Sequence, residues 1–206
     1  MEILYEDKHI VVAIKPVGIL SQADSGGKES MVSVLSDMCK SNIYPLHRLD
    51  RDVSGVMVYA KTKFAAQKLS ADIAEKRFLK VYVATVHGVP KEQSGTMQDL
   101  LFHDSRKNKT YVVKRERKGV KEALLEYTVI KTVQNEDVTL TTARVVLHTG
   151  RTHQIRVQFA SRGMSLVGDR KYGARDDAES IALYSHEIGF YHPETNEYLS
   201  FVYNNG

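Results

Sequence analysis

The sequence predicts an α+β fold: a mixed, mostly antiparallel sheet with a few flanking helices. Two observations lead to this prediction. Segments rich in Val, Ile and Tyr, several of them alternating between apolar and polar residues, outnumber the segments with helical spacing. The connections between the strand-like segments are short and polar, as in hairpins rather than in long crossovers.

Strands are expected where apolar residues alternate, or run together, between turn residues. The first two lie within Ile3–Lys15, around a polar turn at Asp7-Lys8. The others are Val56–Ala60, Phe78–His87, Gly95–Phe102, Lys109–Lys114, Lys121–Thr132, Val138–Leu147, Ser185–Phe190 and Tyr198–Tyr203. Turns are expected at Ser54-Gly55, Asn135-Glu136 and His192–Asn196, because Gly, Asn and Pro break the apolar pattern there.

Helical spacing of apolar residues is found in three segments. They are residues 30–40, residues 62–75 with Thr62 as N-cap, and residues 153–162 with Thr152 as N-cap and Gly163 as the C′ residue. In the third helix, Ile155 and Phe159 are expected to pack inward, whereas His153 and Arg156 share another face.

Composition favours an ordinary globular protein. The chain has 206 residues, of which 42% are hydrophobic and 26% are charged, and this balance is typical of one folded domain. No apolar run approaches the length of about 18 residues that a membrane helix needs, and the N-terminus lacks the pattern of a secretory signal. Cys39 is the only cysteine, so no internal disulfide can form. We therefore expect a cytoplasmic protein with no membrane partner.

Positive charge is concentrated in one segment. The formal net charge is only +4, but Arg106–Lys121 holds eight basic residues and a single acid, Glu116. The basic residues are Arg106, Lys107, Lys109, Lys114, Arg115, Arg117, Lys118 and Lys121. Such a segment favours a polyanionic partner, and the alternative is a hairpin that is simply solvated.

Ionisable residues are also concentrated just before the predicted strand Val56–Ala60. His47, Arg48, Asp50, Arg51 and Asp52 lie within six residues. Charges at the mouth of a buried strand are costly unless they are paired or used, although a solvated loop is the simpler alternative. Asp50 and Asp52 would share a face if both lay on a strand, and a close pair would suit general acid–base chemistry. The residues alone do not choose between the two acids.

Other chemistries lack their motifs. His148 and His153 have no cysteine or acid at the spacing of a metal site, so no metal is expected. The chain has no glycine-rich phosphate loop and no dinucleotide-binding fingerprint, so the motifs of nucleotide-binding enzymes are missing.

Five stretches together resemble the RluA-type pseudouridine synthases, and they fall in the order found in that family. They are Lys15–Gly18, H-R-L-D-R-D-V-S-G at His47–Gly55, Lys80–Ala84, Thr149–Val157 and Gly168–Gly173. The resemblance implies an enzyme, an isomerase that converts specific uridines of structured rRNA or tRNA into pseudouridine. It implies no cofactor, because the reaction is an isomerisation.

The resemblance also assigns roles to four residues. It makes Asp50 the catalytic carboxylate, Arg156 its electrostatic partner and Tyr82 the ring that stacks on the base. It makes Arg48 the residue that supports the extruded nucleotide. Without the resemblance, Arg156 reads as a surface arginine, Tyr82 as a core residue and Arg48 as a salt-bridge partner of Asp50 or Asp52. Asp52 then becomes a structural acid, and His47 and His153 become structural hydrogen-bonding residues.

Members of this family often carry an additional N-terminal S4 RNA-binding domain. Because the first expected strand begins at Ile3, we expect a single catalytic domain over residues 1–206, without an S4 domain, acting as a monomer. The RNA contacts are then expected from Arg106, Lys107, Lys109, Lys114, Arg115, Arg117 and Lys118, together with Arg48. The competing hypothesis is an RNA-binding or folding factor that kept the fold and lost the chemistry.

Overall fold

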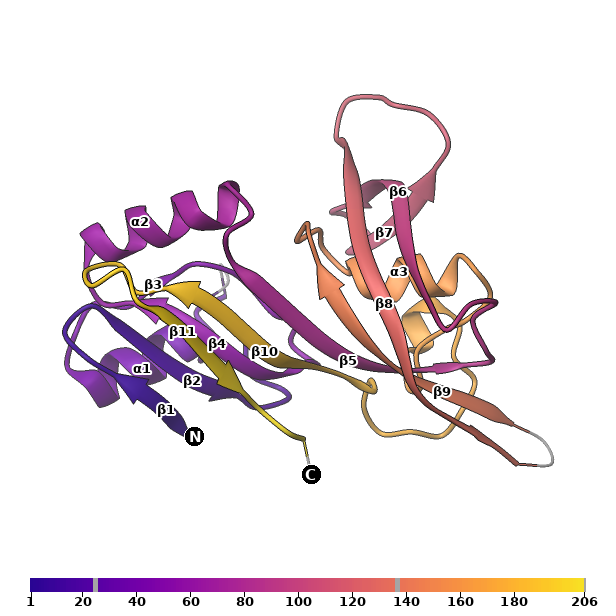
Figure 1. Cartoon of the computed structure of the whole chain (residues 1–206), viewed down its shortest axis with the longest axis horizontal. Helices are drawn as coiled ribbons and strands as arrows, with labels where there is room; N and C mark the ends of the chain where they lie inside the picture. The colour runs from indigo at the N-terminus through magenta and orange to yellow at the C-terminus, as the bar shows by residue number, and fades with distance from the viewer. Residues whose placement is uncertain (24–25, 136–137, 206) are drawn as a thin grey trace. The chain divides into compact units, whose positions relative to one another are not determined.

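The computed structural model describes residues 1–23, 26–135 and 138–205. They form two compact units. Unit 1 comprises residues 1–80 and 184–206, and unit 2 comprises residues 81–183. The chain therefore leaves unit 1 once, builds the whole of unit 2, and returns (Figure 1).

Unit 1 contains strands β1 (Ile3–Glu6), β2 (Ile10–Lys15), β3 (Tyr44–Pro45), β4 (Ser54–Ala60), β10 (Leu183–Tyr191, whose first residue belongs to unit 2) and β11 (Tyr198–Val202). They are ordered β1-β2-β4-β10, and outside this path β11 pairs with β10 and β3 pairs with β4. All pairs are antiparallel except β4 with β10, which is parallel. The helices of this unit are α1 (Met31–Cys39) and α2 (Lys63–Ala74), and Thr62 caps α2 by accepting a hydrogen bond from the backbone N–H of Ala65.

Both faces of β4 are covered, which explains its unbroken apolar run. On one face Val56 and Val58 belong to a core cluster with Leu69 of α2. On the other face Tyr59 and Met57 meet the loop after β2, where the Tyr59 hydroxyl donates to the Ser21 carbonyl at 3.4 Å and Ser21 Oγ lies 3.6 Å from the Met57 sulfur. Burial of every residue of this strand makes β4 a rigid base for the loop that precedes it.

The turn expected at Ser54-Gly55 is wrong, because both residues lie in β4. Gly55 has φ +125° and is paired with Ser185 of β10. A Cβ at position 55 would lie 2.2 Å from the Ser185 carbonyl oxygen. The glycine thus permits a close approach of two strands rather than a change of chain direction.

Unit 2 is built on strands β5 (Leu79–His87, whose first two residues belong to unit 1), β6 (Ser94–Asp104), β7 (Lys109–Val113), β8 (Val120–Gln134) and β9 (Thr139–Leu147). Their order is β5-β9-β8-β6-β7, and every pair is antiparallel. Helix α3 (Gln154–Ala160) and the 3₁₀ helix η1 (Arg170–Tyr172) complete the unit. Val157 of α3 packs on Leu101 and Ala123, with Tyr172 at the edge of this cluster.

The α+β class, the mostly antiparallel sheet and the three helices confirm the fold predicted from the sequence. The predicted Thr152 cap is wrong: His153 is the N-cap residue of α3, at φ 54°, and makes no side-chain cap. The helix also ends at Ala160 rather than Arg162. Ile155 and Phe159 are buried as expected.

Two further predictions are not decided. Glu136, in the expected Asn135-Glu136 turn, lies outside the described residues. A single domain over residues 1–206 stays a prediction. In the part of the chain that the structure describes, no helix is long and apolar enough to cross a membrane.

Candidate active site

Asp50 lies in the loop between β3 and β4, and a buried lysine holds that loop. Lys15, at the end of β2, is fully buried. Its Nζ donates hydrogen bonds to the carbonyl oxygens of Pro16 (2.9 Å), Arg51 (3.1 Å) and Val53 (2.7 Å). An ammonium group has three donors, so these carbonyls satisfy all of them.

The other side of the loop is held by Ser21 and Gly18. Ser21 Oγ accepts from the backbone N–H of Leu49 at 3.0 Å and donates to the Leu49 carbonyl at 2.9 Å. Gly18 and Arg51 exchange two hydrogen bonds of 2.9 Å, one from each residue. The residues on both sides of Asp50 are therefore fixed to the neighbouring β2–α1 segment.

The two acids of the loop have different surroundings. Asp50 is half-buried, whereas Asp52 is exposed, and both lie at a turn closed by the Val53 N–H and the Asp50 carbonyl. They do not share a strand face. Burial lowers the pKa of Lys15 to about 8, and the nearby carboxylates of Asp52 and Asp50 oppose this shift. The loop thus combines a desolvated cation with two acids, of which only Asp50 is partly withdrawn from water.

His47 and Arg48 precede this turn. Burial, assisted by Lys80, lowers the pKa of His47 to about 3, so the imidazole is neutral. Its Nε2 accepts a hydrogen bond of 3.4 Å from the Val58 N–H, and its ring packs on Phe78. This arrangement supports the structural role expected for His47. Arg48 is exposed.

Arg156 is the buried cation of unit 2. It is 4% exposed, and its guanidinium forms a two-pronged pair with Asp169: Nε to Oδ2 at 2.7 Å and Nη2 to Oδ1 at 2.8 Å. The Asp169 side chain is fully buried. Arg156 is therefore no surface arginine, and its orientation is fixed by a planar fork.

A second carboxylate holds the loop that carries Asp169. Asp176 accepts hydrogen bonds from the backbone N–H groups of Gly168 and Ala178, and His87 Nε2 lies 2.7 Å from it. Burial alone would raise the pKa of Asp176, but these hydrogen bonds lower it to about 2. Gly168 has φ +76°, and a Cβ there would lie 2.0 Å from the Ser180 carbonyl oxygen.

Tyr82 lies on β5 opposite Val145 and is 6% exposed. Tyr82 and Arg156 belong to unit 2, whereas Asp50 belongs to unit 1. The pairing of Arg156 with Asp50 stays a prediction, and the carboxylate that Arg156 binds within unit 2 is Asp169.

The sequence prediction missed the roles of Lys15 and Asp169, although both lie in stretches that carry the resemblance. A lysine at the end of an otherwise apolar strand was the available signal for Lys15. No such signal exists for Asp169, because its partner is brought near only by the fold.

The basic segment lies at two turns rather than on one hairpin. Arg106 and Lys107 are exposed in the β6–β7 turn, and Lys109 begins β7. The other predicted RNA-binding residues are exposed in the β7–β8 connection; they are Lys114, Arg115, Arg117 and Lys118. The two strands that the segment contributes to, β7 and β8, do not pair with each other as a hairpin, because β7 pairs with one edge of β6 and β8 with the other.

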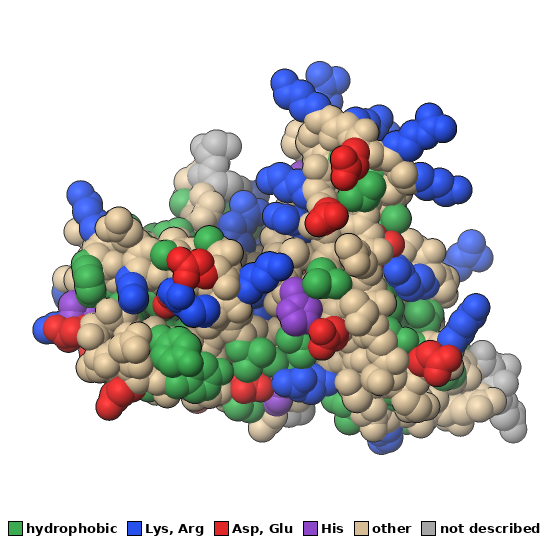
Figure 2. All heavy atoms as spheres, turned by 45° about the horizontal axis from the view of Figure 1, so that its top comes forward, with side chains coloured by type: hydrophobic (Ala, Val, Ile, Leu, Met, Phe, Trp, Pro, Cys, Tyr) green, Lys and Arg blue, Asp and Glu red, His purple; other side chains and the backbone are tan. Residues whose placement is uncertain are grey.

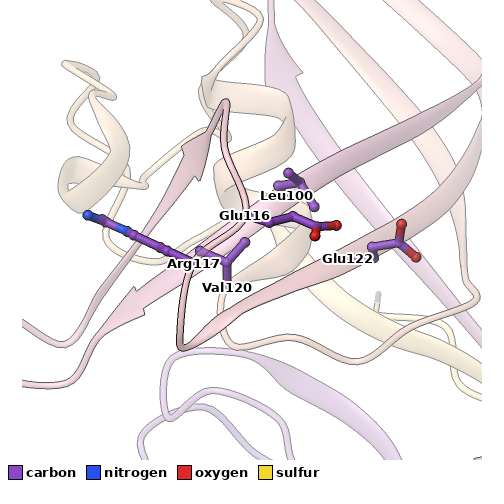
Figure 3. A pocket seen from close by; sticks show the side chains of 5 residues that line it. All are labelled: Leu100, Glu116, Arg117, Val120 and Glu122. Carbon is purple, nitrogen blue, oxygen red and sulfur yellow. The ribbon is translucent and has the colours of Figure 1, made fainter.

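Figure 2 shows Lys and Arg side chains gathered at the top of the view, over the part built by β6, β7 and β8. Next to them, Leu100, Glu116, Arg117, Val120 and Glu122 line a depression of about 450 Å³ (Figure 3). The Arg117 side chain extends away from both carboxylates in this view, and its guanidinium lies 4.6 Å from the centre of the Phe102 ring. The acids make the depression itself unfavourable for phosphate, so phosphate contacts are expected at the exposed turns.

In the described ranges, no group of three or more His, Cys, Asp or Glu side chains is arranged to hold a metal ion.

Comparisons with known proteins identify the family. A sequence model of the family described as RNA pseudouridylate synthase matches residues 9–161. The ribosomal large subunit pseudouridine synthase C of Buchnera aphidicola subsp. Baizongia pistaciae (strain Bp) is 35% identical over 93% of this chain and 63% of its own length. The dual-specificity RNA pseudouridine synthase RluA of Vibrio cholerae serotype O1 (strain ATCC 39315 / El Tor Inaba N16961) is 33% identical over 95% of this chain and 79% of its own length.

A solved structure, human RNA pseudouridylate synthase domain containing 1, has the same fold. It superposes with a TM-score of 0.82 at 21% identity, over 98% of this chain and 82% of the human one. The class that the family model and the two relatives define is an RNA-modifying isomerase. The chain belongs to the RNA pseudouridylate synthase family, in its RluA-type branch, and is a pseudouridine synthase.

The desolvation of Lys15 predicts a pH-dependent stability. Its pKa of about 8 in the folded protein lies below the unfolded value of 10.5, so the unfolded chain binds more protons between these pH values. The free energy of unfolding should therefore rise with pH across this window, by up to about 3 kcal/mol relative to Lys15→Met. Urea unfolding of both proteins at pH 7.5 and pH 10 measures this difference. The exposed control Lys63→Met should follow the wild type, and a wild type that runs parallel to Lys15→Met would contradict a desolvated amine.

The burial of the Arg156–Asp169 pair predicts a large cost for breaking it. Arg156→Ala should lower the free energy of unfolding by about 3–5 kcal/mol, because Asp169 is then left charged in the interior. Arg162→Ala removes a more exposed pair with Asp99 and should cost less than about 1 kcal/mol. Denaturant unfolding compares the two variants. Equal costs would show that the Arg156 pair is not desolvated.

Proposed function

We propose that this pseudouridine synthase modifies specific uridines in structured rRNA or tRNA, with Asp50 as its catalytic carboxylate. The observation that carries the proposal is the anchoring of the Asp50 loop by Lys15 on one side and Ser21 on the other. Catalysis by a carboxylate requires such fixed geometry, since small displacements of a reacting group are costly. The name of the Buchnera relative refers to the large ribosomal subunit and favours a ribosomal substrate, and the name of the Vibrio relative refers to RNA without naming its kind.

The reaction is an isomerisation in which atoms and charge balance. The bond between uracil and its sugar breaks, the uracil turns within the site, and a carbon of the ring rejoins the sugar. The ring carbon that forms the new bond loses a proton, and the ring nitrogen that was bonded to the sugar gains one. No oxidant, reductant or cofactor is therefore consumed. A single ionised carboxylate can assist as nucleophile on the base or sugar, or as general base. Asp50 has this role in the proposal.

Three other residues complete the proposed site. Arg156 stabilises the charge of Asp50, for which a fixed guanidinium is suited. Tyr82 stacks on the uracil ring. Arg48, which is exposed beside the Asp50 loop, occupies the space left in the RNA when the uridine is extruded. Extrusion is required because the reacting atoms are inaccessible within a stack.

The backbone of the RNA is bound by the basic turns at the two ends of β7. The exposed lysines and arginines there can neutralise phosphates without reading sequence. We expect the protein to act as a monomer in the cytoplasm.

The direct test is to incubate the purified protein with total RNA and to map carbon-linked uridine at single-nucleotide resolution. The proposal expects new pseudouridine at defined positions of rRNA or tRNA. Binding of RNA without any isomerisation would instead favour a factor that kept the fold and lost the chemistry.

The proposed role of Asp50 predicts a sharp contrast with Asp52. Asp50→Asn keeps the size of the side chain and removes its charge, so single-turnover isomerisation should fall by more than about 1,000-fold while RNA affinity is kept. Asp52→Asn makes the same change at an exposed position two residues away and should stay within about threefold of wild type. A wild-type rate in Asp50→Asn would remove Asp50 from the mechanism.

The two basic turns predict that the affinity for RNA depends on salt concentration. Changing Lys114, Arg115 and Lys118 to Gln should weaken all RNAs similarly and flatten the dependence of log K on log salt by about 2–3 units of slope. KM should rise more than kcat falls, because phosphate contacts are equal in the ground and transition states. The matched control changes the exposed Lys63, Lys68 and Lys91 to Gln, which removes the same charge elsewhere. Affinity across a salt series measures both, and coinciding lines for the two triple variants would show that the β7–β8 connection does not contact RNA.

A further inference from the structure

Tyr172, the last residue of η1, contacts two cations of unit 2. The Arg156 guanidinium carbon lies 5.2 Å from the centre of its ring, and the Lys109 ammonium lies 5.3 Å from it. Both distances are within the range of cation–π attraction, which is strongest where water is excluded. Arg156 is 4% exposed, so water is largely excluded from its contact with this ring.

The hydroxyl of Tyr172 is held as firmly as the ring. It accepts a hydrogen bond of 2.8 Å from the Thr110 N–H on β7 and lies 2.9 Å from His153 Nδ1 at the start of α3. Burial raises the pKa of Tyr172, so the hydroxyl keeps its proton and can donate it to the imidazole. Thr110 Oγ1 in turn donates to the Thr152 carbonyl at 2.8 Å. One side chain therefore joins η1, β7 and the N-terminus of the helix that carries Arg156.

The same 3₁₀ helix begins directly after Asp169, the partner of Arg156. Arg156 is thus held on one side by the Asp169 carboxylate and is covered by the Tyr172 ring. These two partners are the first and the last of four consecutive residues, 169–172. Next to Tyr172, the Lys171 ammonium donates to the Asn108 carbonyl at 3.0 Å in the β6–β7 turn. The position of the guanidinium therefore depends on how η1 is docked against β7.

The geometry points to Tyr172 as a positioning residue for the isomerisation, which fixes the Arg156 guanidinium through its ring and docks η1 on β7 through its hydroxyl. This inference rests on the proposed function, because it requires Arg156 to act on the reacting site. It expects Tyr172 to affect the chemical step and not the binding of RNA, since its contacts are with protein groups and not with phosphate.

The experiment uses the full chain and compares Tyr172→Leu and Tyr172→Phe with Tyr111→Leu. Tyr111 is the matched control because its ring also lies near Lys109, at 5.9 Å, but is exposed on β7. Removing the ring in Tyr172→Leu should lower the single-turnover rate at saturating RNA by about 10-fold or more. Tyr172→Phe keeps the ring and should lose about 2–5-fold. RNA affinity should stay within about twofold in both, and Tyr111→Leu should match wild type in rate and affinity.

A double-mutant cycle with Arg156→Lys tests whether Tyr172 acts through Arg156. If it does, the rate loss caused by the Tyr172 change should shrink to less than about threefold in the Arg156→Lys background. The reason is that lysine lacks the planar guanidinium that Tyr172 positions. If Tyr172→Leu fails to fold in a thermal melt, the cycle is run with Tyr172→Phe, which differs by one hydroxyl. Its loss should then vanish when Arg156→Lys is already present.

Two results would overturn the inference. One is a wild-type rate in Tyr172→Leu, or in Tyr172→Phe where the leucine variant does not fold. The other is an equal fold-loss in both backgrounds, which would make the effects of Tyr172 and Arg156 independent. An inactive wild type would overturn the proposed function together with the inference, so that failure is distinguished from a failure of Tyr172 alone.

Discussion

The buried Lys15 ammonium is the contact on which the Asp50 loop depends. Three backbone carbonyls converge on a single Nζ, and each would be left without its partner if the amine were removed. A lysine suits this place, because its compact ammonium has three rotatable donors, one for each of the three carbonyls. The desolvation that lowers its pKa is offset in part by the carboxylates of Asp52 and Asp50. The loop conformation and the charge of its acids are therefore coupled through one amine.

Unit 2 handles its buried cation in a different way. Arg156 meets a carboxylate rather than carbonyls, and the planar fork sets the direction of the guanidinium as well as its position. Breaking such a pair is costly, yet a buried pair adds little net stability over apolar packing. A pair that is retained at this cost is better explained by positioning than by stability. The hydrogen bonds that hold the following loop, from Gly168 and His87 to Asp176, extend the same restraint away from the cation.

Local patterns in the sequence are sufficient to predict most strands and helices. They are insufficient where the conformation of a residue is set by a contact with a residue far along the chain. Apolar runs and alternation predict the strands, and the helical spacing of Ile155 and Phe159 predicts the buried face of α3. The turn predicted at Gly55 is wrong because the reason for this glycine, the close approach of Ser185, lies far along the chain. The Thr152 cap is wrong because nothing in the sequence indicates that His153 adopts a left-handed conformation. In the site, the resemblance singles out Asp50, and the exposure of Asp52 gives that choice a physical basis.

The sign and spacing of charge around β7 restrict how RNA can be bound. Basic residues lie in the turns at both ends of this five-residue strand, and a strand rises about 3.3 Å per residue, so the turns are about 17 Å apart. Phosphates bound at both turns are therefore separated along the nucleic acid or come from two backbone segments, as in a folded RNA. Between the turns, Lys109 lies over the Tyr172 ring and is tied to the surroundings of Arg156. The depression lined by Glu116 and Glu122 disfavours phosphate beside the β7–β8 connection. The basic segment is thus not one uniform patch: its exposed turns suit the RNA backbone, and the partly buried Lys109 belongs to the contacts around Arg156.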